Sequence, residues 1–158
     1  MVDNARVRVS AKADYAVRAA VELATAKNGD LVKGEQVAAA QSIPIKFLEN
    51  ILVDLRQAGI VNSRRGPEGG YWLARPADEV TVADVMRAAE GPLASVRGEK
   101  PEDLGYAGSA EPLRDVWVAL RAGLRDVLEH VTLADIAEGK LPKAVTGRTR
   151  EPGAWERR

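Results

Sequence analysis

The 158-residue sequence contains no cysteine and only one histidine, His130. Without cysteine the chain cannot form a disulfide, a thiolate metal site, a cysteine-held iron–sulfur cluster or a thiol nucleophile. No nucleophile–base pair, metal-ligand set or cofactor fingerprint can be assembled from the remaining residues. We therefore expect no metal, no cofactor and no catalytic residues.

Long apolar runs and an excess of positive charge are also absent. No run approaches the roughly 20 apolar residues of a membrane span, and the start "MVDNARVRVS" lacks the apolar core of a secretory signal, so we expect a cytoplasmic protein without a membrane partner. The 23 basic residues equal the 23 acidic ones, which gives no general sign of nucleic-acid binding. The halves differ, however, because residues 1–75 carry 11 basic against 8 acidic residues and residues 76–158 carry 12 against 15.

The first half is rich in helical patterns. Apolar spacing predicts helices over 10–27, 34–41 and 45–58, the first capped by Ser10. A compact turn at 42–44 places a proline at the entry of the third helix, and residues 1–9 are expected to form a short arm or an edge strand. The third helix has an apolar period near 3.6, and we expect the following side chains to be buried: Phe47, Leu48, Ile51, Leu52 and Leu55. Its opposite face is polar and available to solvent or to a partner.

A glycine-rich turn follows the third helix. Residues 60–64 and 71–75 read as short strands joined by "RGPEGG", which predicts a β-hairpin. A phosphate-binding loop is excluded, because the stretch lacks the G-x-x-x-x-G-K-[ST] pattern and opens no helix. By itself the basic hairpin could be a solvated turn or a contact to a polyanion. A helix over 81–91 begins with a capping box, in which Asp84 lies three residues after Thr81.

The second half contains the longest predicted helix, over 113–131. Its apolar residues are spaced 4, 3, 4, 3 and 4 apart, and they are Leu113, Trp117, Leu120, Leu124, Val127 and Val131. This a/d seam covers about two and a half heptads and favours pairing with a second helix, although packing inside one chain remains an alternative. Residues 92–112 read as a loop and 140–158 as a flexible tail. Residues 132–139 read as a short helix that begins with the same Thr-x-x-Asp cap, at Thr132 and Asp135.

Three helices followed by a hairpin form the order of a winged helix-turn-helix. We therefore predict a mainly α fold with a small two-stranded β-wing and a long C-terminal dimerisation helix. The predicted units are a DNA-binding domain (1–91), a loop (92–112), the dimerisation helix with a short following helix (113–139) and the tail (140–158). In this arrangement the third helix lies in the major groove of double-stranded DNA and the wing reaches the flanking backbone.

Four segments between roughly residues 8 and 93 carry a more specific resemblance. They read "VSAKADYAVRAAVELA", "IPIKFLENILVDLRQAGIV", "SRRGPEGGYWLARP" and "EVTVADVMRAAEGP". In this order they resemble the IscR/BadM (Rrf-type) family of bacterial transcription regulators. The resemblance implies a homodimer that binds a palindromic operator, usually as a repressor. It also implies a set of DNA-binding residues: Ser42, Pro44, Ile45, Lys46, Glu49, Asn50, Arg64, Arg65, Gly66, Gly69 and Gly70.

The chain departs from this family in the loop before the long helix. Many relatives hold an iron–sulfur cluster there with three cysteines, whereas this loop, "EGPLASVRGEKPEDLGYAGSAEP", has none. We therefore expect no cluster and no sensing through one, so that any effector would be a small molecule or a partner protein. The alternative function is a protein-interaction module that retains the fold, which zero net charge and the acidic Glu68 at the wing tip favour.

Overall fold

The computed structural model describes residues 8–158, so most of the predicted arm or edge strand at 1–9 lies outside the described residues. The α-helices are α1 (Ala11–Ala24), α2 (Gly34–Gln41), α3 (Ile45–Gln57), α4 (Val82–Glu90), α5 (Leu113–Leu128), α6 (Leu133–Ala137) and α7 (Lys143–Thr149). The strands are β1 (Val61–Arg64) and β2 (Gly70–Leu73), and the 3₁₀ turns are η1 (Lys27–Gly29), η2 (Ala77–Glu79), η3 (Pro101–Asp103) and η4 (Gly108–Ala110). This architecture confirms the predicted fold class.

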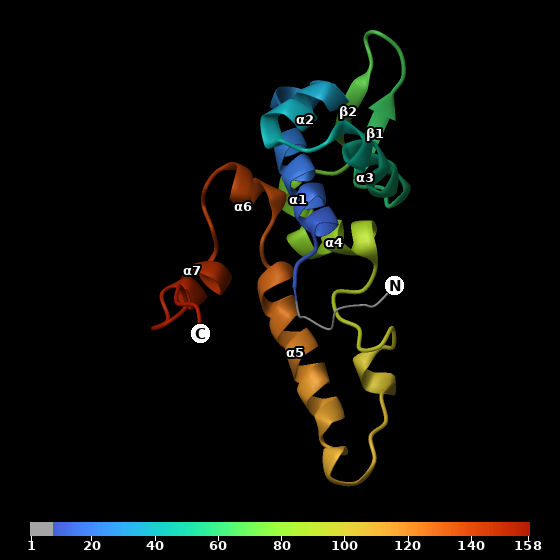
Figure 1. The fold of residues 1–158 in the computed structure, drawn as a ribbon. Coiled ribbons are helices and arrows are strands. Elements are labelled where there is room, and N and C mark those ends of the chain that lie inside the picture. The colour runs from blue at the N-terminus through green and yellow to red at the C-terminus, as the bar shows by residue number, and fades with distance from the viewer. Residues whose placement is uncertain (1–7) are drawn as a thin grey trace.

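Helix α1 forms the centre of the core. Its backbone begins at the predicted cap, where Ser10 Oγ accepts a hydrogen bond from the backbone N–H of Ala13 at 3.0 Å. Its buried face consists largely of alanine, which lets neighbouring helices approach closely: Ala13, Ala16, Ala19 and Ala20. Helices α2, α3, α4 and α6 all pack against it (Figure 1).

Helix α3 follows α2 through a three-residue turn. Ser42 ends α2 in the left-handed conformation (φ 54°), and Pro44 is the residue before the first turn of α3. The buried face of α3 is the predicted one, with a single exception. Phe47 was predicted to be buried, but its side chain is 61% exposed, so that prediction was wrong. It precedes the fully buried Leu48 by about 100° of helical rotation, which places it at the edge of the apolar stripe.

The hairpin has a regular antiparallel register, in which Val61 pairs with Leu73 and Arg64 with Gly70. A third segment joins it at Val32, whose backbone exchanges hydrogen bonds of 2.9 and 2.8 Å with Tyr71. The base of the wing is therefore held against the segment that leads into α2.

Two capping boxes meet where the chain returns to the core after α5. Thr81 opens α4 and Thr132 opens α6, each with an aspartate three residues on, as the sequence predicted for both. The two threonines form an antiparallel bridge, and the backbone N–H of Leu133 donates to the Val80 carbonyl at 2.9 Å. Leu133 is fully buried, so α6 packs into the same core as α1–α4.

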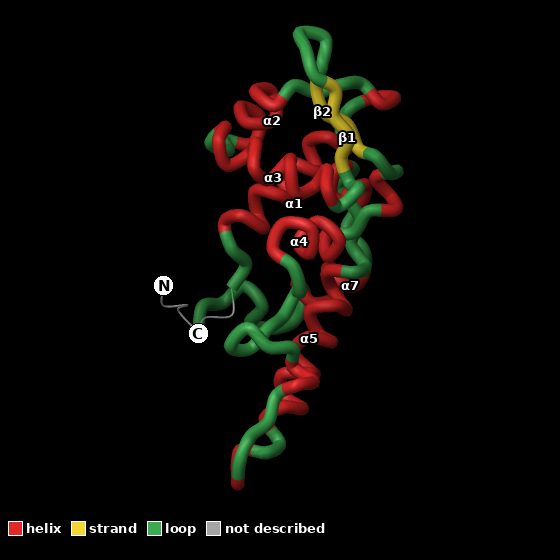
Figure 2. The backbone as a smooth tube through the Cα atoms, turned by 90° about the vertical axis from the view of Figure 1, so that its right-hand side faces the viewer, coloured by secondary structure: helices red, strands yellow, loops and turns green. Residues whose placement is uncertain are grey.

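Helix α5 extends away from this core as a rod (Figure 2). The loop 92–112 runs beside it, with η3 packed against α5. Within this loop Glu102 pairs with Arg121 of α5, and Tyr106 accepts a 2.9 Å hydrogen bond from the indole of Trp117. The loop is thus attached to the rod by polar contacts as well as by the buried Leu104.

Helix α5 is three residues shorter than predicted, since it ends at Leu128 and not at 131. Val131 was predicted to belong to the dimerisation seam, and this prediction was wrong. Its side chain is only 5% exposed and its carbonyl accepts from the Val82 N–H at 2.9 Å, because the chain has already turned back into the core.

The segment 140–158, predicted to be a flexible tail, contains α7, a helix that the sequence did not indicate. Helix α7 packs beside α5, and Arg148 in it lies 3.9 Å from Asp126. In the described part of the chain, no helix combines the length and apolarity needed to cross a membrane.

Candidate nucleic-acid interface

The exposed face of α3 carries the side chains predicted to contact DNA. Lys46, Glu49 and Asn50 are all exposed, as is Ile45 in the first turn. No side chain caps the helix start, because Pro44 precedes it and has no polar side-chain atom. The first-turn N–H groups therefore add to the positive potential of Lys46 at this end.

The wing turn depends on three glycines. Gly66 has a φ of +100°, which favours glycine, and its carbonyl accepts the Gly69 N–H at 2.9 Å. A Cβ atom on Gly69 would lie 2.1 Å from the carbonyl oxygen of Arg64, so no larger residue fits without a backbone shift. Gly70 is similarly confined, because a Cβ atom placed on it would lie 2.9 Å from the Val32 carbonyl oxygen. Gly69 and Gly70 are buried and shape the hairpin.

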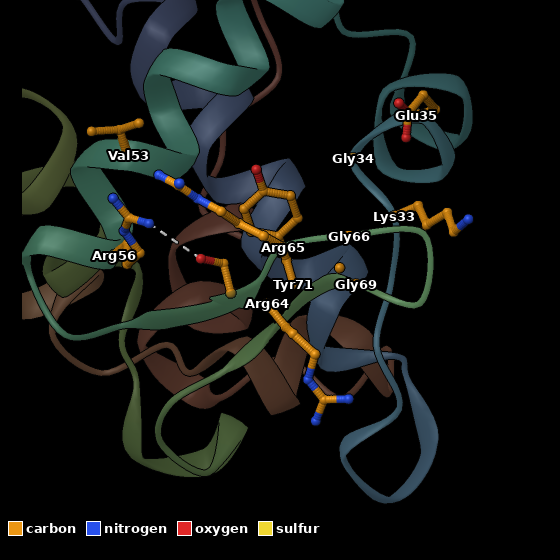
Figure 3. A pocket seen from close by; sticks show the side chains of 12 residues that line it. Lys33, Gly34, Glu35, Val53, Arg56, Arg64, Arg65, Gly66, Gly69 and Tyr71 are labelled. Carbon is orange, nitrogen blue, oxygen red and sulfur yellow. Dashed lines mark hydrogen bonds between the residues drawn. The ribbon is translucent and has the colours of Figure 1, made fainter.

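A groove of about 470 Å³ lies between the wing, the start of α2 and α3. Its lining includes basic residues from all three elements, namely Lys33, Arg56, Arg64 and Arg65. Figure 3 shows the Arg65 side chain directed across Tyr71 toward α3, while Arg64 leaves the hairpin on the other side. This divergence follows from the alternation of neighbouring side chains along a strand. Arg56 also donates to Ser63 Oγ at 3.3 Å and so links α3 to β1.

The cations on this surface form no salt bridge in the described part of the chain, although Glu35 also lines the groove. Within residues 8–158, these basic side chains have no Asp or Glu oxygen within 4.0 Å: Lys33, Lys46, Arg56, Arg64 and Arg65. By contrast, the arginines of α1, α4 and α5 are mostly paired, and Asp54 on α3 is bound by Lys12 at 2.9 Å. Cations without a partner in their own chain are available to an external anion.

The groove brings together only part of the predicted set. The predicted wing residues line it, whereas α3 contributes Val53 and Arg56. The predicted α3 residues lie nearer the exposed start of that helix, and Ser42 lies in the turn just before it. Sequence reasoning missed Lys33, and it assigned Arg56 only to a general polar face. Lys33 could not be found because its approach to the wing depends on the Val32–Tyr71 bridge between distant segments.

A second candidate surface is the seam of α5. None of its residues is fully buried in the single chain, and the seam side chains that remain on the helix are half-buried: Leu113, Trp117, Leu120, Leu124 and Val127. Val116 beside them is 54% exposed. An apolar stripe of this length along a protruding helix is typical of an interface.

Comparison with known proteins gives a consistent match along most of the chain. The model of the Rrf2 family, described as "Iron-dependent Transcriptional regulator", matches residues 9–139. A Mycobacterium tuberculosis protein, Rv1287, whose name places it among the HTH-type transcriptional regulators, is 57% identical over 139 residues, which cover 88% of this chain and 86% of the relative. The transcriptional regulator IscR of Cereibacter sphaeroides is 37% identical over 139 residues, covering 85% and 90% of the two chains.

Solved structures agree with this match. CymR, the global cysteine regulator of Bacillus subtilis, superposes with a TM-score of 0.71 at 30% identity, covering 85% of this chain and 98% of CymR. IscR of T. potens superposes with a TM-score of 0.68 at 32% identity, covering 84% and 88%.

Proposed function

Because the chain belongs to the Rrf2 family, and so is a DNA-binding transcription regulator and not an enzyme, we propose that it acts as a homodimer that binds a palindromic operator and represses transcription. The observation that carries the proposal is the cluster of unpaired cations on α3, the wing and the start of α2. A duplex offers this surface a matching row of phosphates.

Helix α3 enters the major groove with its first turns. Glu49 can accept a hydrogen bond from a cytosine amino group, and the Asn50 amide can pair with adenine. Lys46 and the first-turn N–H groups lie close enough to one another to contact one strand of the backbone.

The groove beside the wing holds a second stretch of backbone. Arg65 and Arg56 face the groove from the wing and from α3, whereas the Lys33 side chain points away from both (Figure 3). A phosphate that enters beside α3 therefore meets the two arginines. Glu68 at the wing tip repels phosphate, and we expect the tip to stand away from the duplex while Arg64 and Arg65 make the contacts.

The α5 seam joins two chains. Pairing of the rods would cover the half-buried leucines and place two α3 helices in successive major grooves, about 34 Å apart. A two-fold dimer reads a palindrome because both halves present the same surface.

Iron does not fit this chain, although the family description includes it. An iron–sulfur cluster needs thiolate ligands, and the sequence has no cysteine. Among residues 8–158, no group of three or more His, Asp or Glu side chains could hold a metal ion. In the loop before α5, Glu102 is already paired with Arg121. The proposed regulator therefore binds DNA without iron.

The wing contact is tested by replacing Arg65 and Arg64 separately with alanine. Each change should weaken binding to operator and random duplex alike and lower the slope of log affinity against log salt by about one. Affinities are measured by fluorescence anisotropy at several salt concentrations.

Arg150→Ala is the matched control, since Arg150 is an exposed arginine near the C-terminus, away from the wing. Unchanged slopes for both wing variants would remove the wing from the mechanism. If the native protein binds every duplex weakly, and this binding is lost as the salt concentration rises, the result would instead favour a protein-interaction module.

A further inference from the structure

Phe47 is the largest apolar side chain on the exposed face of α3. It is 61% exposed, and Ile45 and Val53 on the same helix are 39% and 43% exposed. The three lie within eight residues of one another in the helix expected to contact DNA, which also carries the unpaired Lys46. A large aromatic side chain left in water in the first turns of this helix is available for contact with a ligand.

The ring of Phe47 is held in place on one side. It packs against Tyr15 of α1 with 6.4 Å between ring centroids and an angle of 53° between planes. Tyr15 in turn lies under the Arg18 guanidinium at 4.8 Å, and Arg18 donates to the Gln41 carbonyl at 2.6 Å. The aromatic side chain is thus oriented before any ligand binds, which lowers the entropy cost of using it.

The charge around Phe47 identifies the occupant. Lys46 and the uncapped N–H groups add positive potential at the helix end that carries the ring, and the carboxylate of Asp54 is paired with Lys12. A partner that both covers the ring and carries negative charge is therefore favoured. The major groove of DNA offers both features, since it is lined by phosphates and contains one apolar group, the C5-methyl of thymine.

We propose that Phe47 is a specificity-determining residue that packs on the methyl group of a thymine in each operator half-site. The inference rests on the proposed function, because it requires α3 in the major groove. It adds that recognition at the start of α3 is by apolar contact as well as by the polar side chains of Glu49 and Asn50.

The test replaces thymine by uracil, which removes only the methyl group. Operator fragments are first recovered from genomic DNA with the full-length protein, and each thymine of one half-site is then changed in turn. The native protein should lose about fourfold in affinity at one or two positions, the effect of one buried methyl group. Phe47→Ala should bind the thymine operator more weakly than the native protein does. Replacing thymine by uracil at the sensitive positions should then cause no further loss of affinity, so the protein change and the DNA change form a double-mutant cycle.

Trp155→Ala is the matched control. Trp155 is an aromatic residue that is 84% exposed and lies near the C-terminus, so this variant should keep the uracil sensitivity of the native protein. Urea denaturation of Phe47→Ala should show only a small loss of stability, because the ring is mostly exposed and loses only its packing against Tyr15.

The outcomes separate the two proposals. Specific operator binding without any uracil-sensitive position, or with the same sensitive positions in Phe47→Ala, overturns the role of Phe47 and leaves the proposed function intact. Absence of specific binding by the native protein overturns both.

Discussion

At the scale of single residues, Gly69 is the wing position with the least space. Its missing Cβ would lie 2.1 Å from the Arg64 carbonyl oxygen, a backbone atom that cannot move without distorting β1. A change at this position therefore displaces the neighbouring Arg64 and Arg65 without touching the core.

We expect Gly69→Ala to reduce operator affinity by about tenfold or more, because two phosphate contacts lose their geometry together. Fluorescence anisotropy measures the affinity, and urea denaturation should show a loss of stability confined to the hairpin.

Gly105→Ala serves as the comparison, since nothing lies within 4 Å of a Cβ built on Gly105. It should bind as the native protein does. Equal affinity of the two variants would mean that the wing adapts to the larger residue.

At the scale of elements, the two capping boxes hold α4 and α6 together. Thr81 and Thr132 each cap a helix and also bridge to one another, so one joint serves both helix starts. The same joint fixes the point at which the chain re-enters the core after α5.

Replacing either threonine with alanine should lower the free energy of unfolding by about 1 kcal/mol, because one helix N–H loses its acceptor. The double variant should deviate from additivity, since the residues are in contact. Urea denaturation measures both.

Thr146→Ala within α7 is the comparison. It should lower the free energy of unfolding by less, because the Thr146 hydroxyl makes only a 3.4 Å bond to the Pro142 carbonyl. An equal loss in this variant would argue against the capping role of the two threonines.

The loop beside α5 is an element with a measurable electrostatic contact. A backbone N–H bond and the Arg121 guanidinium hold the pKa of Glu102 below its ordinary value of 4.5. Because the folded pKa is lowered, the contribution of this contact to stability is complete above the ordinary value and is lost as the pH falls through the lowered one.

NMR titration of the Glu102 carboxyl carbon should therefore give a midpoint below 4.5. In Arg121→Leu the midpoint should rise but remain lowered, since the backbone bond is the larger cause. A native midpoint at or above the ordinary value would contradict the contact.

At the scale of the whole molecule, the protruding α5 rod leaves an apolar stripe without complete cover in one chain. The stripe lies on the opposite side of the rod from Ala122. A second rod is the partner that would bury it symmetrically.

Changing Leu120 and Leu124 to glutamate should produce monomers, because pairing would bring four carboxylates into an apolar seam. Light scattering measures the mass, and the monomer should lose most of its affinity for a palindromic duplex. Ala122→Glu adds one charge per chain off the seam and should remain dimeric. A dimer that persists in the double leucine variant would place the seam inside one chain.

The sequence by itself determined the features that depend on neighbouring residues. The caps at Ser10, Thr81 and Thr132, the turn before α3 and the hairpin were all predicted, because each is decided by hydrogen bonds or apolar spacing within a few positions. The order of these elements along the chain predicted the winged fold, and the family resemblance added the set of expected DNA-binding residues.

Only the tertiary structure decided which side chains are covered and which distant residues meet. Phe47 matched the apolar pattern but lies beyond the edge of the packed stripe, and Val131 matched the seam but follows the turn back into the core. Lys33 joins the wing through a bridge between segments nearly 40 residues apart. Local pattern fixes a side chain's direction on its own helix, whereas burial depends on what the rest of the chain places opposite it.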